Sequence, residues 1–211
     1  MWGDEVRSLV VEDDREIHPQ SAAEVAKRVL VLWAIVLRAE GVDRADCDSV
    51  LDTHGIWDAA SPSERAFLRA ENPDPATAQE LVWRLEALWI LLWALGLLDE
   101  VPWPSGMCDV PRIADIVNPR EMDSSFISDA CLIPLPSIVD QQDLTMKIHW
   151  AIRDAYINRK GIPEDLDWRN PARTPVEQCS VIGVVEQRHH TLNWILNFMS
   201  PENWDDVDTP T

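Results

Sequence analysis

Residues 186–194 hold most of the side chains that could do chemistry. They read Glu-Gln-Arg-His-His-Thr-Leu-Asn-Trp within a predicted C-terminal helix. Helical spacing places His189 beside Asn193, and Arg188 interrupts an apolar stripe. His149, on the preceding predicted helix, could approach His189. These groups could form a ligand site, or a structural network, since an unmet buried polar group costs about 1–3 kcal/mol.

The turn after the central apolar helix supplies three more candidates for that network or ligand site: Trp103, Ser105 and Asp109. Trp103 could stack on a ligand or pack as a buried wedge. A zinc site needs three or four converging ligands, whereas the adjacent His189 and His190 point in different directions on a helix. Phosphate-binding glycine loops and a G-x-S-x-G nucleophile turn are missing from the sequence. The sequence therefore predicts no catalytic residue, no metal site and no cofactor.

Charge is the strongest signal in the composition. The 211 residues include 18 basic and 37 acidic side chains, a formal net charge of −19. This balance argues against direct nucleic acid binding, which requires Lys and Arg at the phosphates, and against anionic membrane surfaces. It favours a fast encounter with a cationic partner, or it serves solubility alone.

Two acidic segments could contact such a partner. Residues 42–60 surround a short predicted helix, and residues 200–211 form a predicted acidic tail that could also be simply solvated. Trp57 and Trp204 could anchor the contact, because tight interfaces usually bury an aromatic side chain. The candidate contact residues are Asp43, Asp46, Asp48, Asp52, Trp57, Asp58, Trp204, Asp205, Asp206 and Asp208.

Capping signals and apolar periodicity predict an all-α fold with long central helices and irregular Pro-rich connections. Helices are expected over 21–38, over a short stretch within 42–60 that ends at Gly55, over 61–70, from 74 to about 95, and over 112–117, 137–160 and 174–199. We expect one domain over 1–211, with an acidic N-terminal segment at 1–20. Four widely spaced cysteines and an acidic N-terminus predict reduced thiols in a cytoplasmic protein.

Several motifs together resemble the bacterial domain-of-unknown-function family 4272. They are Arg7-Ser8, the stretch 28–41, Gly55-Ile56-Trp57-Asp58, the stretches 83–89, 97–109 and 188–194, and the closing Trp204-Asp205-Asp206-Val207-Asp208-Thr209-Pro210. The resemblance implies a helical cytosolic bacterial domain and brings no reaction with it. By analogy with other small acidic bacterial proteins, such a domain could act as an immunity protein beside a secreted toxin.

The leading functional hypothesis is thus a stoichiometric inhibitor of a basic protein, for example a nuclease toxin delivered by type VI secretion. An acidic inhibitor can occupy a phosphate-binding surface by imitating the charge of nucleic acid. The alternative is an enzyme or a small-ligand or metal-binding protein centred on His189 and His149. The sequence leaves the oligomeric state open.

Overall fold

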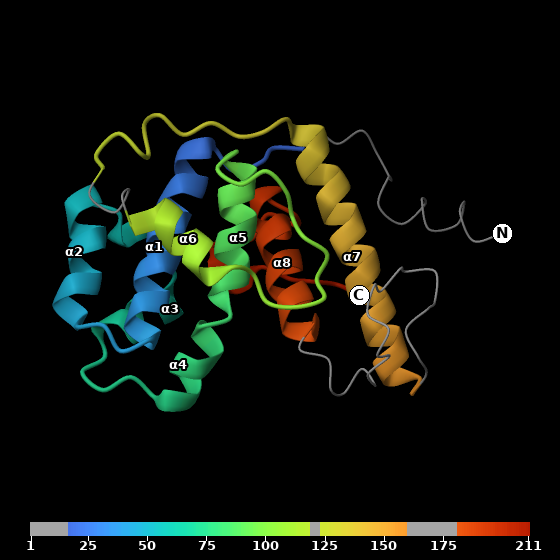
Figure 1. Ribbon diagram of the computed structural model, residues 1–211, viewed down its shortest axis with the longest axis horizontal. Coiled ribbons are helices and arrows are strands. Elements are labelled where there is room, and N and C mark those ends of the chain that lie inside the picture. Colours follow the sequence, from blue (N-terminus) through green and yellow to red (C-terminus); the bar gives the residue numbers. More distant parts are fainter. Residues whose placement is uncertain (1–16, 119–122, 160–180) are drawn as a thin grey trace.

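The computed structural model describes residues 17–118, 123–159 and 181–211, and within these ranges the chain forms helices and no strand (Figure 1). The predicted all-α fold is confirmed. Two short 3-10 helices, Trp57–Ala59 and Trp204–Asp206, accompany the α-helices. The α-helices are α1 (Ala22–Ala39), α2 (Arg44–His54), α3 (Pro62–Arg69), α4 (Pro75–Leu81), α5 (Arg84–Ala94), α6 (Val110–Val117), α7 (Leu135–Ile157) and α8 (Val181–Ile195).

Most predicted helix ends are found where side chains can satisfy the free backbone groups. Ser61 and Glu64 form a complete capping box at the start of α3, and Asp74 caps α4. Ser21 caps α1 through its own side chain. Gly55 ends α2 in the left-handed conformation, at a φ of 63°. The capping box predicted at residues 174–177 lies outside the described residues.

The single long helix predicted from residue 74 to about 95 is wrong, because the chain divides it into α4 and α5. Between them, the amides of Trp83, Leu85 and Glu86 bond to carbonyls three residues back. The ring of Trp83 lies against Gly183 of α8, where an added Cβ would meet it at 3.3 Å. A packing contact with α8 therefore accompanies the tightened turn.

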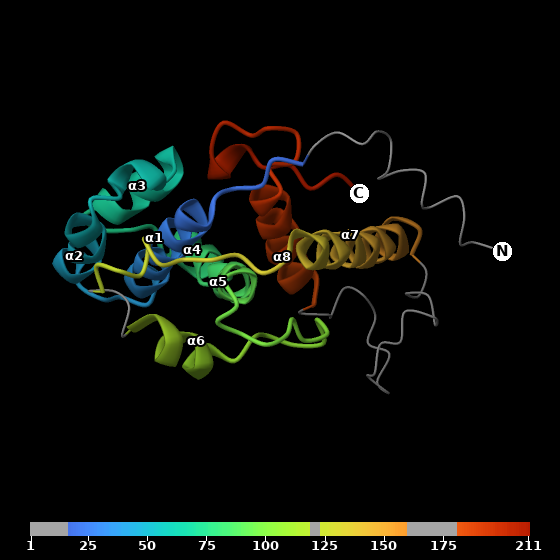
Figure 2. The same ribbon diagram turned by 90° about the horizontal axis from the view of Figure 1, so that it is seen from above.

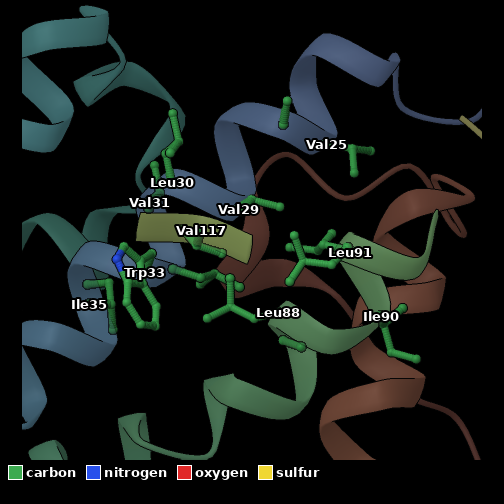
Figure 3. Packing of buried hydrophobic residues seen from close by; sticks show 14 of the residues in the cluster. Val25, Val29, Leu30, Val31, Trp33, Ile35, Leu88, Ile90, Leu91 and Val117 are labelled. Atoms are coloured by element: carbon green, nitrogen blue, oxygen red, sulfur yellow. The ribbon is translucent and has the colours of Figure 1, made fainter. Parts of the chain in front are cut away.

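The core is centred on α1 and α5, which lie side by side (Figures 1 and 2). Every residue from 85 to 94 is buried, so α5 has no solvent face. Figure 3 shows Leu88 and Leu91 of α5 near Val29 of α1, with Val117 of α6 beside them. The same apolar cluster includes the indole of Trp204.

The helix α7 is the outermost element and packs along α8 (Figures 1 and 2). It begins at Leu135, two residues before the predicted cap Ser137, with Pro136 in its first turn. The apolar spacing of Leu144, Ile148, Ile152 and Ala155 predicts one inward face, and the last three are buried, but Leu144 is 41 % exposed. The prediction for Leu144 is wrong because the buried face of α7 also holds polar side chains, Gln142, Thr145 and His149.

Helix α8 ends at Ile195, four residues before the predicted end. Asn197, Met199 and Ser200 all have positive φ angles, which reverse the chain direction. The closing segment then returns to α8 and α3 (Figure 2). No helix among the described residues is long and apolar enough to cross a membrane.

Candidate functional site

A buried ion pair joins α8 to α5. The Nε and Nη2 atoms of Arg188 lie 3.0 and 2.9 Å from Oε2 of Glu86. The other Glu86 oxygen accepts the backbone N–H of Cys108 at 2.6 Å, and Arg188 donates to the carbonyl of Pro102 at 2.6 Å. The pair therefore fixes α8, α5 and both ends of the 102–108 turn to one another.

His149 of α7 and His189 of α8 meet within the helix interface. Their Nδ1 atoms are 2.9 Å apart, and each residue is 1 % exposed. One ring must donate from Nδ1 and the other must accept, so the two rings have different tautomers. Burial lowers the pKa of each to about 4, with the Arg153 charge adding to the effect on His149. Both imidazoles are neutral at physiological pH.

These histidines predict a loss of stability in mild acid. His190 is also buried enough that its pKa falls to about 3. In the unfolded chain these histidines take up protons near pH 6.5, whereas in the folded chain they do so only near pH 3–4. Above pH 6.5 both states are unprotonated at these sites and the folded state keeps its full stability. Stability is lost as the pH falls from 6.5 toward the pKa values of the folded state. We expect each of these three histidines to lower the free energy of unfolding by about 1–2 kcal/mol from about pH 7 to about pH 5.

Urea unfolding at a series of pH values measures this drop. The variant His189→Gln keeps a polar side chain at the helix interface but cannot take up the proton, so its stability should depend less steeply on pH. A wild-type stability that is constant over the same range would contradict the burial argument.

Asn193 connects α7, α8 and the C-terminal segment. Its carbonyl oxygen accepts from Nε2 of Gln142 at 3.1 Å, and its amide nitrogen donates to the backbone carbonyl of Asp208 at 2.8 Å. Asn193 is fully buried. Its side chain thus holds the end of the chain against the α7–α8 interface.

A second buried ion pair joins α1 to α3. Nη1 of Arg28 donates to Oε2 of Glu64 at 2.6 Å, and Nη2 donates to the carbonyl of Ala59. The guanidinium carbon of Arg28 is 4.8 Å from the ring centre of Trp204 and 5.6 Å from that of Trp194. Arg28 therefore combines a buried salt bridge with cation–π contacts to the C-terminal segment.

The carboxylate of Asp205 binds the start of α3. Its Oδ1 accepts from the hydroxyls of Ser61 and Ser63 at 2.8 and 2.7 Å, and its Oδ2 accepts the Ser63 backbone N–H at 3.0 Å. Partial burial acts to raise the pKa of Asp205, but these hydrogen bonds outweigh it and lower the pKa. Asp205 is thus a structural clasp for the closing segment.

Trp204 cannot serve as an exposed anchor, because it is only 1 % exposed. Its ring packs edge-on against His190 at 4.6 Å and Trp194 at 5.4 Å between ring centres. Asp206 and Asp208 remain exposed. The closing segment is therefore integrated into the fold through Trp204 and Asp205, and only part of it is available to a partner.

The 103–109 turn places two of its three predicted side chains, Ser105 and Asp109, at the surface and not in the buried histidine interface. Ser105 is exposed, and Asp109 is an exposed N-cap that accepts the Arg112 N–H at 3.1 Å. Trp103 packs on the small apolar cluster that contains Ile152 and Val185. The turn contacts the polar network through its backbone, at the Pro102 carbonyl and the Cys108 N–H. The side-chain types in the sequence could not predict these backbone contacts.

The described residues include no group of three His, Cys, Asp or Glu side chains able to hold a metal ion. Cys47 and Cys108 are buried, and burial raises the pKa of Cys47 to about 11. Burial also raises the pKa of Cys108, with the neighbouring Glu86 carboxylate adding to it. Both thiols are protonated and poor nucleophiles. Cys131 is exposed, and Cys179 lies outside the described residues.

The comparison with known proteins returns one family. A family model described as a domain of unknown function, DUF4272, matches residues 5–207. The chain belongs to this family. No curated protein and no solved structure matches it.

In this DUF4272 domain, the predicted acids of the 43–58 segment occupy α2 and the turn after it. Asp43, Asp46, Asp52 and Asp58 are exposed. Asp48 is half-buried and pairs with Arg44 at 3.1 Å. Helix α2, which holds Asp46 and Asp52 and has Asp43 as its N-cap residue, lies at the end of the molecule opposite α7 (Figures 1 and 2), and Asp58 lies in the 3-10 helix Trp57–Ala59.

Trp57 is half-buried at the edge of the same surface. Its indole N–H donates to Asp52 at 2.6 Å, and the guanidinium of Arg69 lies 5.0 Å from its ring centre. An open groove of about 560 Å³ adjoins α2, with Lys27, His54 and Asp58 among its lining residues. Unlike Trp204, Trp57 is placed where a partner could cover it.

Proposed function

We propose that this DUF4272 domain is an acidic binding protein that inhibits a basic protein partner stoichiometrically, as an immunity protein inhibits a nuclease toxin. The observation that carries the proposal is the group of four exposed carboxylates on α2 and its following turn, which we call the α2 acidic surface: Asp43, Asp46, Asp52 and Asp58.

Electrostatics gives the proposal its mechanism. A nuclease holds phosphates with Lys and Arg, so a surface of carboxylates can occupy the same site. With a net charge of −19, the whole domain also attracts a basic partner at long range. Complementary charge raises the association rate toward about 10⁸–10⁹ M⁻¹s⁻¹ at low salt.

Residence time requires a buried anchor in addition to charge. Trp57 is the aromatic side chain at this surface, and the neighbouring groove can accept a side chain of the partner. We assign Trp57 the anchoring role, with the α2 acidic surface providing orientation. Loss of Trp57 should therefore raise the dissociation rate, whereas loss of the carboxylates should lower the association rate.

The test begins with co-purification of the domain with the product of the neighbouring gene. The binding kinetics of that product are then measured with a variant in which the α2 acidic surface is changed to asparagine. We expect association to slow about 10-fold or more at low salt, since steering is the main effect of surface charge. The four substitutions are Asp43→Asn, Asp46→Asn, Asp52→Asn and Asp58→Asn.

A matched variant removes the same charge from exposed positions elsewhere: Glu80→Gln, Asp99→Asn, Glu100→Gln and Glu202→Gln. It should slow association much less, because the steering depends on where the charge lies. If both variants slow association equally, the slowing comes from net charge in general and the α2 acidic surface has no special role. Absence of binding to a neighbouring basic protein, together with unchanged survival after deletion, would overturn the proposal.

A small-ligand or enzymatic site at His149 and His189 is the second candidate. One observation favours it: Nε2 of His149 is buried without a hydrogen-bond partner and lies 4.0 Å from a Glu186 carboxylate oxygen. Measuring metal in the purified protein and comparing His189→Ala with wild type separates the two roles. Lost ligand binding with an intact fold would favour this candidate, whereas unfolding would favour the structural network.

A further inference from the structure

The outer face of α7 is apolar although it packs on no described element. Trp150 is 53 % exposed and Ile157 is 67 % exposed. The helix packs through its other side on α8, and both views show it at the edge of the molecule (Figures 1 and 2). Side chains this large are costly to leave in water, so a face of this kind indicates a contact surface.

Trp150 and Ile157 belong to one stripe with coiled-coil spacing, in which Val139 and Met146 are half-buried, whereas the exposed Leu144 and Tyr156 lie outside it. Steps of four, three, four, three and four residues keep six positions on a single side of the helix. We call these positions the α7 seam: Val139, Asp143, Met146, Trp150, Arg153 and Ile157. The seam has apolar ends, an apolar centre and one charge between them on each side.

The seam is a palindrome in both spacing and chemistry. Reversing the order 4-3-4-3-4 leaves it unchanged. If two copies of α7 meet in opposite directions, Val139 faces Ile157 and Met146 faces Trp150 of the second copy. The same register sets Asp143 opposite Arg153, and it does so twice because the arrangement is two-fold symmetric. Within each copy Nζ of Lys147 donates to Oδ2 of Asp143 at 2.5 Å, so the contact between copies would share that carboxylate. The opposite charges at the two matched positions, Asp143 and Arg153, favour a second copy of this chain as the occupant.

We propose that the α7 seam is the surface through which two copies of this chain associate, with their α7 helices antiparallel. The apolar pairs supply the burial and the two Asp143–Arg153 pairs set the register. This inference does not rest on the proposed function, since the α2 acidic surface lies at the opposite end of the molecule (Figure 1). The pair would present two such surfaces, facing away from each other.

Salt distinguishes this association from the proposed inhibition. Each copy has a net charge of −19, so two copies repel one another and screening should favour their pairing. A complex with a basic partner should weaken under the same conditions. The Debye length shrinks from about 30 Å at 0.01 M to about 3 Å at 1 M ionic strength. A salt series over this range should therefore show both the strengthening of the homodimer and the weakening of the complex with a basic partner.

The experiment is sedimentation velocity on the full chain, followed by charge reversal in the seam. At high salt we expect a species of twice the 24.0 kDa chain mass. With Asp143→Arg alone, each contact between position 143 of one copy and position 153 of the other holds two cations. With Arg153→Asp alone, each such contact holds two anions. Each single variant should therefore weaken association at least 10-fold. An equimolar mixture of the two variants should restore it, as should the double variant, because opposite charges again face each other.

Trp150→Ala should also dissociate the pair, and Leu144→Ala is its control, being 41 % exposed on the same helix but outside the seam. Circular dichroism checks that each variant is folded. The proposal is overturned if wild type stays monomeric at high salt, or if a dimer forms that the seam variants leave intact. Restoration in the mixture is the decisive result, because a general loss of folding cannot produce it.

Discussion

Replacing Arg188 with methionine should lower the free energy of unfolding by about 3–5 kcal/mol, because the change leaves the Glu86 carboxylate buried without its cation. Glu86 is fully buried, and Arg188 is 2 % exposed. The carbonyl of Pro102 loses its donor in the same step. Urea denaturation at neutral pH measures the loss, and thermal unfolding should show a lower midpoint.

Two comparisons separate charge burial from lost packing. The double variant Arg188→Met with Glu86→Leu removes both charges, so it should be more stable than Arg188→Met alone. It should not fully recover, because the Cys108 N–H and the Pro102 carbonyl are then both without partners. Lys27→Ala removes a salt bridge whose side chains are 28 % and 45 % exposed, and it should cost less than about 1 kcal/mol. A small effect of Arg188→Met would contradict the assignment.

Local features of the fold were predictable from the sequence. The starts of α1 and α3 and the end of α2 depend on side chains within a few residues, such as Ser61 with Glu64 and Gly55. The division between α4 and α5 was not predictable, because Trp83 and its neighbours also suit a continuous helix. What distinguishes them is the contact of Trp83 with Gly183, 100 positions along the chain.

Only the α8 members of the polar network were predictable from the sequence. Arg188, His189 and Asn193 stand out within an apolar helix, so their need for partners could be inferred. The partners themselves come from distant positions: Glu86 and Gln142 lie 102 and 51 residues away. A signal did exist, since Glu86 is the one charged residue in the otherwise apolar run from 85 to 94.

Arg28 and the closing segment show that local composition identifies neither the partner of a buried charge nor the direction of a side chain. Arg28 lies between the apolar positions 25–26 and 29–36 of α1, which indicated burial, but nothing local identified Glu64 as its partner. The acids around Trp204 suggested a surface tail. The indole is nevertheless buried, because the guanidinium of Arg28 packs on it and the imidazole of His190 contacts its edge. The acidic residues next to Trp204 indicate a solvated segment, but they do not determine whether the Trp204 side chain points into the core.

Trp204→Ala should lower the free energy of unfolding by about 3–5 kcal/mol, because it empties a large, fully enclosed site and removes the ring on which Arg28 rests. The closing segment should also detach, so the Ser63 amide, which donates to Asp205, should exchange with solvent much faster. Tyr156→Ala removes a large aromatic side chain that is 60 % exposed and lies outside the α7 seam, so it should cost about 0.5 kcal/mol or less. Hydrogen exchange and urea unfolding of both variants measure these differences. A Trp204→Ala protein of normal stability, or one with Ser63 still protected, would mean that the acidic segment is held by its carboxylates alone.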